Sequence, residues 1–238
     1  MTRLSDPRDV LTVWESAADV TPAARGAALA HQLGFAADLD TALDLSLAEC
    51  ASISVRAFIE SYGTKVDGVV RCTTCGETLE VQMPLDGLDL ETIASPTETV
   101  TTTVGDVKVR SPTTRDLLLA GSSESPVEAL LVRCVSSPEG RPVQVDLLSV
   151  NDRATVDAAC ERLSGLAGVV LATECPACGA TVQAGIDPAA LWWQRIQESA
   201  RRVVAEVSAL AGAFGWSESD VLAMSPGRRA AYLAVVTP

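Results

Sequence analysis

The sequence predicts an α+β protein in which helical N- and C-terminal parts flank two short β-hairpins, with an α/β insertion between the hairpins. Apolar residues recur at three- and four-residue spacings near both ends of the chain, which is the period of an amphipathic helix. Around two Cys-x-x-Cys-Gly turns the apolar residues alternate with polar ones, which is the period of a strand. The segment between the two turns carries both patterns.

These patterns divide the 238 residues into three regions. A helical region is expected at each end, and the central region contains the hairpins and the insertion. The predicted bounds are 1–66 for the N-terminal region, 67–186 for the central region (hairpins 67–85 and 168–186, insertion 86–167) and 187–238 for the C-terminal region.

Cap residues followed by proline predict the helix starts of the N-terminal region. Asp6-Pro7 and Thr21-Pro22 are two such starts, because a short polar side chain caps the helix and proline fits its first turn. A third helix is expected over 46–62, and Gly63 ends it.

The last fifty or so residues repeat these signals. Asp187-Pro188 opens a long helix that is expected to stop at Gly215. The segment 217–220 resembles a capping box with aspartate in place of glutamate, and Ser225-Pro226 predicts the start of the last helix.

Each Cys-x-x-Cys-Gly turn is expected inside a β-hairpin. Before the first turn stand Val69 and Val70, and an alternating run that begins at Leu79 follows it. A similar apolar run, 169–171, precedes the second turn, and Val182 follows it. This is an internal repeat of strand, tight turn and strand.

The insertion is expected to mix strands and helices. The threonine-rich segment 97–103 is either a strand or a mobile loop, and 107–110 alternates like a strand. Short helices are predicted after 111–114 and after Ser125-Pro126, with a loop over 136–140 and a longer helix over 151–166.

Four cysteines in the two turns have the spacing of a metal site. Two residues between the cysteines of one turn let both thiolates reach the same ion, and the glycine lets the backbone curl beneath them. Two such turns supply four soft ligands, which predicts one structural zinc ion in a zinc-ribbon-like pair of hairpins. The ligands are Cys72, Cys75, Cys175 and Cys178.

Other chemistries use the same pattern. The 99 residues between Cys75 and Cys175 exceed the usual zinc-ribbon spacing, but closure entropy grows slowly with loop length. A thioredoxin-like redox motif normally opens a helix, whereas strands are expected after both turns here. Disulfides and an iron–sulfur cluster remain open as alternatives.

The remaining cysteines and the single histidine indicate no catalytic site. Cys50, Cys134 and Cys160 lie among apolar residues and are expected to be buried, and His31 stands alone in an alanine-rich helix. There is no glycine-rich phosphate loop and no Gly-x-Ser-x-Gly motif, so we expect a protein that is not an enzyme.

Composition narrows the possible partners. A net charge of −13 disfavours binding to nucleic acid, because phosphate backbones are bound mainly by clustered Lys and Arg. No apolar run is long enough to span a bilayer, and the first ten residues lack the apolar stretch of a signal peptide. We therefore expect a cytoplasmic protein without a membrane partner.

The order of motifs resembles the baseplate proteins of contractile phage tails and related contractile injection systems, and is similar to the phage baseplate hub assembly protein family. Two positions depart from that pattern, because Thr73 stands where proline is expected and Ser208 where histidine is expected. The segments that carry the resemblance are 58–63, 72–80, 109–117, 130–134, 175–179, 191–192, 213–222 and 228–233.

The resemblance implies an assembly or structural role in the baseplate, in the cytoplasm or within the assembled particle, through contacts with hub, spike or wedge proteins. Aromatic residues dominate protein interfaces, so four of them are candidate contacts, although burial in the core is an alternative. Arg115 is either a docking residue or part of an internal polar cluster with Arg110 and Asp116. The aromatic candidates are Trp192, Trp193, Trp216 and Tyr232.

Further alternatives remain open. Arg201-Arg202 and Arg228-Arg229 either meet acidic partners or are solvated helix faces. Two other functions compete with the baseplate role. One is a zinc-ribbon regulator that binds nucleic acid or a transcription partner, and the other is a dithiol redox protein.

Overall fold

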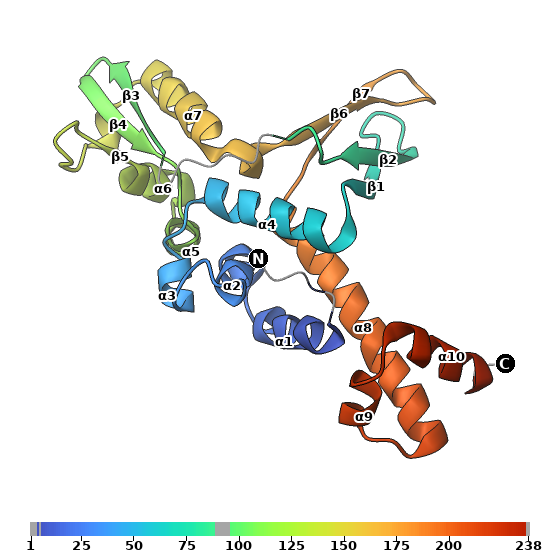
Figure 1. Cartoon of the computed structure of the whole chain (residues 1–238). Coiled ribbons are helices and arrows are strands. Elements are labelled where there is room, and N and C mark those ends of the chain that lie inside the picture. The colour runs from blue at the N-terminus through green and yellow to red at the C-terminus, as the bar shows by residue number, and fades with distance from the viewer. Residues whose placement is uncertain (1–3, 5, 89–95, 237–238) are drawn as a thin grey trace.

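The computed structural model, which describes residues 4, 6–88 and 96–236, confirms the α+β class, with 56% of the chain helical and the strands in small sheets. Figure 1 shows a helical body from which two β-containing parts project on the same side. One is the insertion, with its own sheet and helix, and the other is the pair of hairpins. Residues 89–95, at the start of the predicted insertion, lie outside the described residues.

The N-terminal helices form where the caps predict them. Asp6 accepts a hydrogen bond from the Arg8 N–H, and Ser46 forms a full capping box with Glu49. At Thr21-Pro22 the chain first forms one 3₁₀ turn, η1, and the α-helix α2 begins after it. The short helix α3 was not predicted from the sequence. The elements are α1 (Pro7–Ala18), η1 (Pro22–Ala24), α2 (Arg25–Gln32), α3 (Leu39–Ala42) and α4 (Leu47–Tyr62).

The C-terminal region is built on one long helix. Asp187 caps its start by accepting from the backbone N–H groups of Ala189 and Ala190, and Gly215 ends it in the left-handed conformation at φ 70°. The predicted capping box of Ser217 with Asp220 is confirmed. The elements are α8 (Pro188–Phe214), α9 (Glu218–Leu222) and α10 (Pro226–Val236).

The main core, which we call the helical core, lies between α1, α2, α4 and the first half of α8. Trp192 and Ile196 are completely buried in it, as is Leu29 from α2. Burying one such side chain contributes about 1.5–3 kcal/mol relative to leaving it exposed. Segments separated by more than a hundred residues are therefore held together mainly by apolar packing.

The insertion has a separate small core. Its sheet has the strand order β3-β4-β5, and α7 packs on β3 and β4 around Val107, Val109 and Val156. The segment 97–103 is therefore mostly strand, and Ser136, expected in a loop, belongs to β5. The elements are β3 (Thr97–Thr102), β4 (Gly105–Arg110), α5 (Thr114–Gly121), α6 (Pro126–Cys134), β5 (Val135–Ser136), η2 (Val145–Leu147), α7 (Val150–Ser164) and η3 (Gly165–Gly168).

Two antiparallel hairpins complete the fold, as predicted. In each hairpin the two strands pair without a break up to the residues that flank a Cys-x-x-Cys turn, Arg71 with Thr78 and Glu174 with Thr181. Figure 1 shows the hairpins projecting next to each other. The strands are β1 (Lys65–Arg71), β2 (Thr78–Pro84), β6 (Val170–Glu174) and β7 (Thr181–Gly185).

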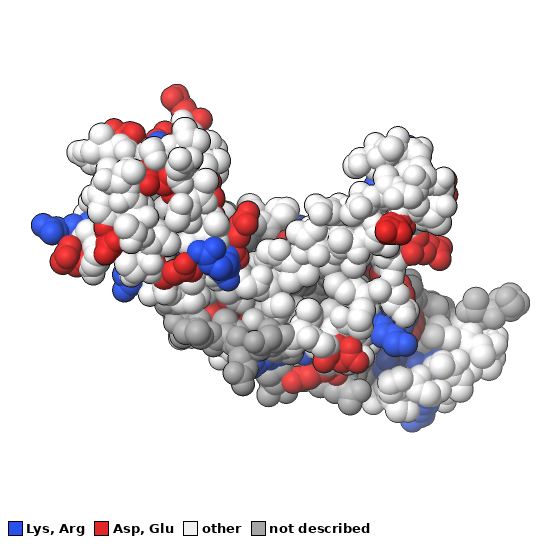
Figure 2. Space-filling model, turned by 90° about the horizontal axis from the view of Figure 1, so that it is seen from above, with Lys and Arg blue, Asp and Glu red and all other residues white. Residues whose placement is uncertain are grey.

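Figure 2 looks down on the projecting parts and shows a hollow between them. The part at the left, which is the insertion, carries many acidic side chains on this face. Within the described residues, every helix is too short or too polar to cross a membrane.

Candidate metal centre

The two Cys-x-x-Cys turns have the same backbone structure. In the first turn the Cys72 N–H donates to the Glu77 carbonyl oxygen at 2.8 Å, and the Gly76 N–H donates to the Cys72 carbonyl oxygen at 2.9 Å. In the second turn, Cys175 and Gly179 make the equivalent bonds at 2.9 and 2.8 Å. The internal repeat seen in the sequence is therefore also a repeat of geometry.

Glycine is required at both turns for a physical reason. Gly76 has φ 77° and Gly179 has φ 70°, a left-handed conformation that strains residues with a Cβ atom. This conformation turns the chain back toward the second strand while the backbone N–H groups stay beneath the sulfur atoms. The glycine therefore holds the two cysteines of each turn on one side.

The tips of the two hairpins bring the four thiols together. The Cys72 and Cys178 Sγ atoms lie 3.7 Å apart, and those of Cys75 and Cys175 lie 3.6 Å apart, so each close pair joins the two hairpins. All four Sγ atoms lie within 4.8 Å of one another. The sequence prediction that these cysteines share a site therefore agrees with their placement.

These distances suit a metal ion better than disulfides. Disulfide sulfurs are about 2.05 Å apart, and all seven cysteines of the chain are free thiols. Four sulfurs at about 2.3 Å from a tetrahedral ion would be about 3.8 Å from one another, close to the two distances above. The cluster can hold a metal ion.

The four thiols show the same pattern of burial in the two turns. The first cysteine of each turn, Cys72 or Cys175, is buried, and the second, Cys75 or Cys178, is exposed. Leu79 and the equivalent Val182 are buried beside the sulfurs. A small apolar layer therefore covers the inner side of the cluster, and the outer side faces solvent.

Ionisation of the thiols is linked. Backbone N–H groups of Cys75 and Thr74 lower the pKa of Cys72 to about 6, because they stabilise its thiolate. The Glu77 N–H acts in the same direction on Cys75, but the neighbouring thiols of Cys178 and Cys175 outweigh it and raise the pKa of Cys75 to about 12. Four adjacent thiolates repel one another, and a bound cation removes that repulsion.

The aromatic residues named as candidate contacts fall into two groups. Trp192 and Trp193 are 0% and 4% exposed and belong to the helical core, so the alternative of core burial applies to them. Trp216 and Tyr232 are half-buried. Trp216 stacks on Phe214 at a centroid distance of 4.5 Å, and Tyr232 packs edge-on against Phe214 at 5.7 Å and against Trp216 at 4.8 Å. This aromatic cluster joins the last residue of α8, Phe214, to Trp216 in the following loop and Tyr232 in α10.

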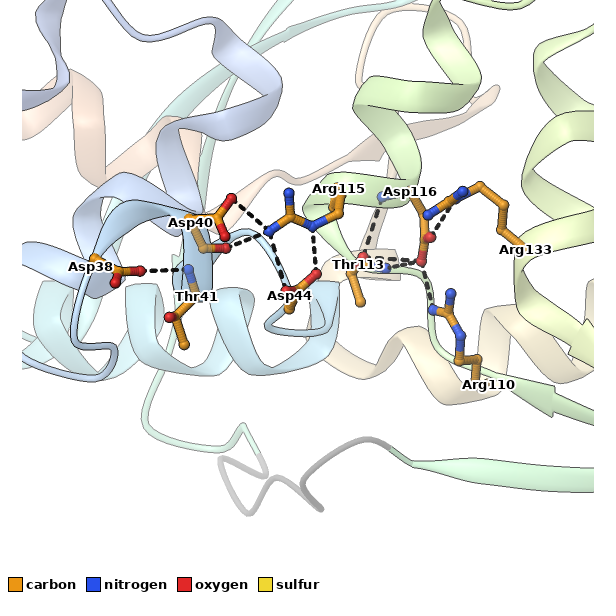
Figure 3. A network of polar contacts seen from close by, with 9 residues as sticks. All are labelled: Asp38, Asp40, Thr41, Asp44, Arg110, Thr113, Arg115, Asp116 and Arg133. Atoms are coloured by element: carbon orange, nitrogen blue, oxygen red, sulfur yellow. Dashed lines mark hydrogen bonds and ion pairs between the residues drawn. The ribbon is translucent and has the colours of Figure 1, made fainter. Parts of the chain in front are cut away.

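Asp116 organises a polar network between the insertion and the N-terminal helices (Figure 3). Its carboxylate, 1% exposed, accepts from Arg110 at 2.6 Å and from Arg133 at 2.7 Å. It also accepts from the Thr113 N–H in a capping box. Burial raises the pKa of Asp116, but Arg110, Thr113 and Arg133 outweigh burial and lower the pKa to about 2.

Arg115 extends this network in the opposite direction, as Figure 3 shows. Its guanidinium donates to Asp44 at 2.7 Å and to Asp40 at 3.0 Å, near the short helix α3. Of the three residues Arg110, Arg115 and Asp116, the structure pairs Arg110 with Asp116, whereas Arg115 pairs with Asp44 and Asp40. Arg115 remains partly exposed, and its role as a partner contact stays a prediction.

Asp152 is a second carboxylate of this kind, which sequence reasoning did not single out. It caps α7 with Ser149, and it accepts from both the N–H and the hydroxyl of Thr103 in the β3–β4 turn. The Ser-x-x-Asp spacing was the available signal. No sequence pattern predicts the bond from Thr103 to Asp152, because the two residues are far apart in the chain.

The other cysteines and the histidine lie away from the metal centre. Cys50 and Cys134 are buried, and burial raises the pKa of their thiols to about 11 and about 12. Cys160, which was expected to be buried, is only half-buried, next to the core of the insertion. His31 bonds the Ala36 carbonyl oxygen through Nδ1 at 3.1 Å. These contacts suit structural residues.

Comparison with known proteins relates part of the chain to a described protein family. No curated protein and no solved structure matches the chain. Residues 35–140 match the family model described as "T4 bacteriophage base plate protein". That range contains Cys72, Cys75 and the Asp116 network, whereas Cys175, Cys178 and the C-terminal helices lie outside it. Over residues 35–140 the chain is therefore similar to a phage baseplate protein, which supports a structural role in a baseplate.

Proposed function

We propose that this protein is a structural or assembly component of the baseplate of a contractile, phage-tail-like injection system. The observation that carries the proposal is the match of residues 35–140 to the T4 bacteriophage base plate protein family. The chain acts through protein–protein contacts with hub, spike or wedge proteins and carries out no catalysis. It works in the cytoplasm, where such particles assemble, or within the finished particle.

The four-cysteine cluster holds one zinc ion in a zinc-ribbon arrangement. Zinc prefers tetrahedral thiolate sites, and four protein ligands leave no open position for water. The ion therefore fixes the two hairpins to each other and does not activate a substrate. The residues that hold it are Cys72, Cys75, Cys175 and Cys178.

The aromatic cluster at the end of α8 is the surface we assign to a partner protein. Tyr232 packs edge-on against Trp216 at 4.8 Å, and Arg228 lies over the Tyr232 ring at 5.7 Å. Half-exposed aromatics with an adjacent arginine have the composition of interface hot spots. Arg115 is the other proposed contact, on the opposite side of the helical core.

Deleting the gene in the cell that produces the particle tests the baseplate role. We expect particles without a complete baseplate in electron micrographs, and restoration by the wild-type gene but not by a Trp216→Ala, Tyr232→Ala variant. A matched control is Val235→Ala, an exposed residue on α10 outside the aromatic cluster. Normal particles from the deletion strain would contradict the role.

Two measurements on the purified protein separate the proposal from its competitors. Elemental analysis should find one zinc per chain, and the four thiols of the cluster should resist alkylation in the native protein, because a closed site protects its ligands. Rapid alkylation of a metal-free protein would favour the dithiol redox function. Tight and salt-sensitive binding to DNA in a filter assay would favour the nucleic-acid regulator.

A further inference from the structure

A polar pocket of about 260 Å³ lies between the end of α4, the start of β1 and the middle of α8. Lys65, Arg195 and Arg202 line it, together with two acids, Asp67 and Glu198. The pocket thus carries one more positive than negative charge, in a chain whose net charge is −13. Three cations around one cavity are unusual on such an acidic protein.

One of the two acids in the pocket is paired with a cation, and the other accepts a hydrogen bond from a neutral amide and keeps its charge. Asp67 accepts a hydrogen bond from the Gln82 side-chain amide at 2.8 Å, and Glu198 pairs with Arg195 at 3.3 Å. Lys65 and Arg202, in contrast, have no carboxylate within ion-pair distance among the residues that the structure describes. Their charges are therefore available to a ligand.

Neutral donors and an apolar wall complete the pocket. The Tyr62 hydroxyl lies 3.4 Å from the Ser199 hydroxyl, and the buried ring of Phe58 forms part of the wall. Burial raises the pKa of Tyr62, and Arg202 and Arg195 oppose that rise from nearby. The hydroxyl therefore stays protonated at neutral pH and can donate to an anion beside the guanidinium groups.

We infer that this pocket binds a carboxylate of a partner protein, with Arg202 and Lys65 as its main ligands and Tyr62 as a neutral donor. An arginine fork matches a carboxylate in a bidentate geometry, and charge-assisted bonds of this kind are about twice as strong as neutral ones. At physiological ionic strength the Debye length is about 8 Å, so the pocket acts on a nearby carboxylate while most of the chain's negative charge is screened. That the carboxylate belongs to a protein rests on the proposed baseplate role.

Fluorescence anisotropy of a labelled synthetic peptide tests the inference on the full, metal-loaded chain. The peptide carries two adjacent glutamates in an otherwise neutral sequence, and its control carries glutamines in their place. We expect the glutamate peptide to bind at least fivefold more tightly than the control. A Lys65→Gln, Arg202→Gln variant should remove that difference.

Arg201 gives a matched control, because it is exposed on the same helix, next to Arg202, but does not line the pocket. Arg201→Gln should change the affinity less than twofold. Equal weakening by Arg201→Gln, equal binding of the two peptides, or no binding of either at millimolar concentration would each overturn the inference. Stronger displacement of the peptide by inorganic phosphate than by acetate would overturn the choice of a carboxylate.

The result is independent of the baseplate test. All variants change exposed side chains, and their metal content is measured alongside the peptide affinity. If the protein binds the glutamate peptide but particles assemble without it, the inference about the pocket stands and the proposed baseplate role is wrong. If particles need the protein but it does not bind the glutamate peptide, the baseplate role stands and the inference about the pocket is wrong.

Discussion

The helical core and the pair of hairpins both join segments that are far apart in the sequence, but different interactions hold them. The helical core buries many large side chains, among them Trp192, Ile196 and Leu29. The base of the first hairpin, with Val66 in β1 and Met83 in β2, also packs on the helical core. At the cysteine ends of the two hairpins the apolar cluster has four buried members, Cys72, Leu79, Cys175 and Val182, and two of these are thiols. Isolated two-stranded hairpins are marginally stable in water, so a region with this little apolar burial depends on its sulfur cluster.

Metal removal should therefore separate the two regions, and it is the largest effect we expect. With a strong chelator, or in a Cys175→Ser variant, amide protons at the cysteine ends of β1, β2, β6 and β7 should lose their protection from exchange. Protection in α4 and α8 should remain, because apolar packing holds them. Hydrogen exchange measured by mass spectrometry gives both readings, and structural zinc contributes on the order of 10 kcal/mol in small zinc domains.

Cys160→Ser is the control for this experiment. Cys160 is half-buried and lies in the insertion, outside the four-thiol cluster. It should leave one metal ion per chain and the exchange pattern of the hairpins unchanged. Persistent protection of the hairpins in the metal-free protein would show that the comparison between the two regions is wrong.

Trp192→Ala tests the helical core in the same way, because it removes apolar packing and leaves the thiol cluster intact. Removing this completely buried ring from the helical core should lower the free energy of unfolding by about 3–5 kcal/mol, because it leaves a cavity. Metal content should stay at one ion per chain, because Trp192 is not part of the hairpin cluster. Urea unfolding followed by circular dichroism measures the change, and an unaffected midpoint would contradict burial in the core.

Asp116→Asn should have the next largest effect. The amide cannot satisfy both Arg110 and Arg133, so we expect a loss of about 2–3 kcal/mol in the free energy of unfolding. Asp44→Asn is the matched control, because the Asp44 side chain is 61% exposed where it meets Arg115. Its urea midpoint should move much less, and equal shifts for the two variants would argue against a special role of the buried carboxylate.

The stabilisation that the Asp116 carboxylate contributes to the folded protein should decrease as the pH falls. The pKa of this carboxylate is lowered from 3.8 to about 2 in the folded protein. Its stabilisation is therefore present above about pH 5 and is lost as the pH falls toward 2, where the folded carboxylate also binds a proton. The stability difference between wild type and Asp116→Asn should shrink over that range, and a constant difference would refute the assignment.

Much of the local structure could be predicted because its signals are local. The Ser46 and Ser217 capping boxes and the two Cys-x-x-Cys-Gly hairpins each lie within a few residues of chain. Each is decided by hydrogen bonds between near neighbours, which residue type and spacing already specify. β5 was missed because a two-residue strand exists only through its pairing with β4.

Side-chain roles were harder to predict than helices and strands. Trp192 and Trp193 have the residue type of interface contacts, yet the packing of α8 against α1 and α4 places them in the core. Arg229 belongs to a pair that was expected to be solvated or to meet acidic partners. It is instead 5% exposed and bonds Glu206 at 2.9 Å, because α10 folds back on α8.

By itself, the sequence determined the helix caps, the two hairpins, the four candidate ligands and the acidic charge of this chain, because residue type and short spacing specify each of them. The tertiary structure decided that the four thiols meet, that Asp116 lies between two arginines and that Lys65 and Arg202 line one pocket. These contacts join residues that are up to 137 positions apart in the printed sequence. Such contacts exist only after apolar packing has fixed how the helices and hairpins are placed relative to one another.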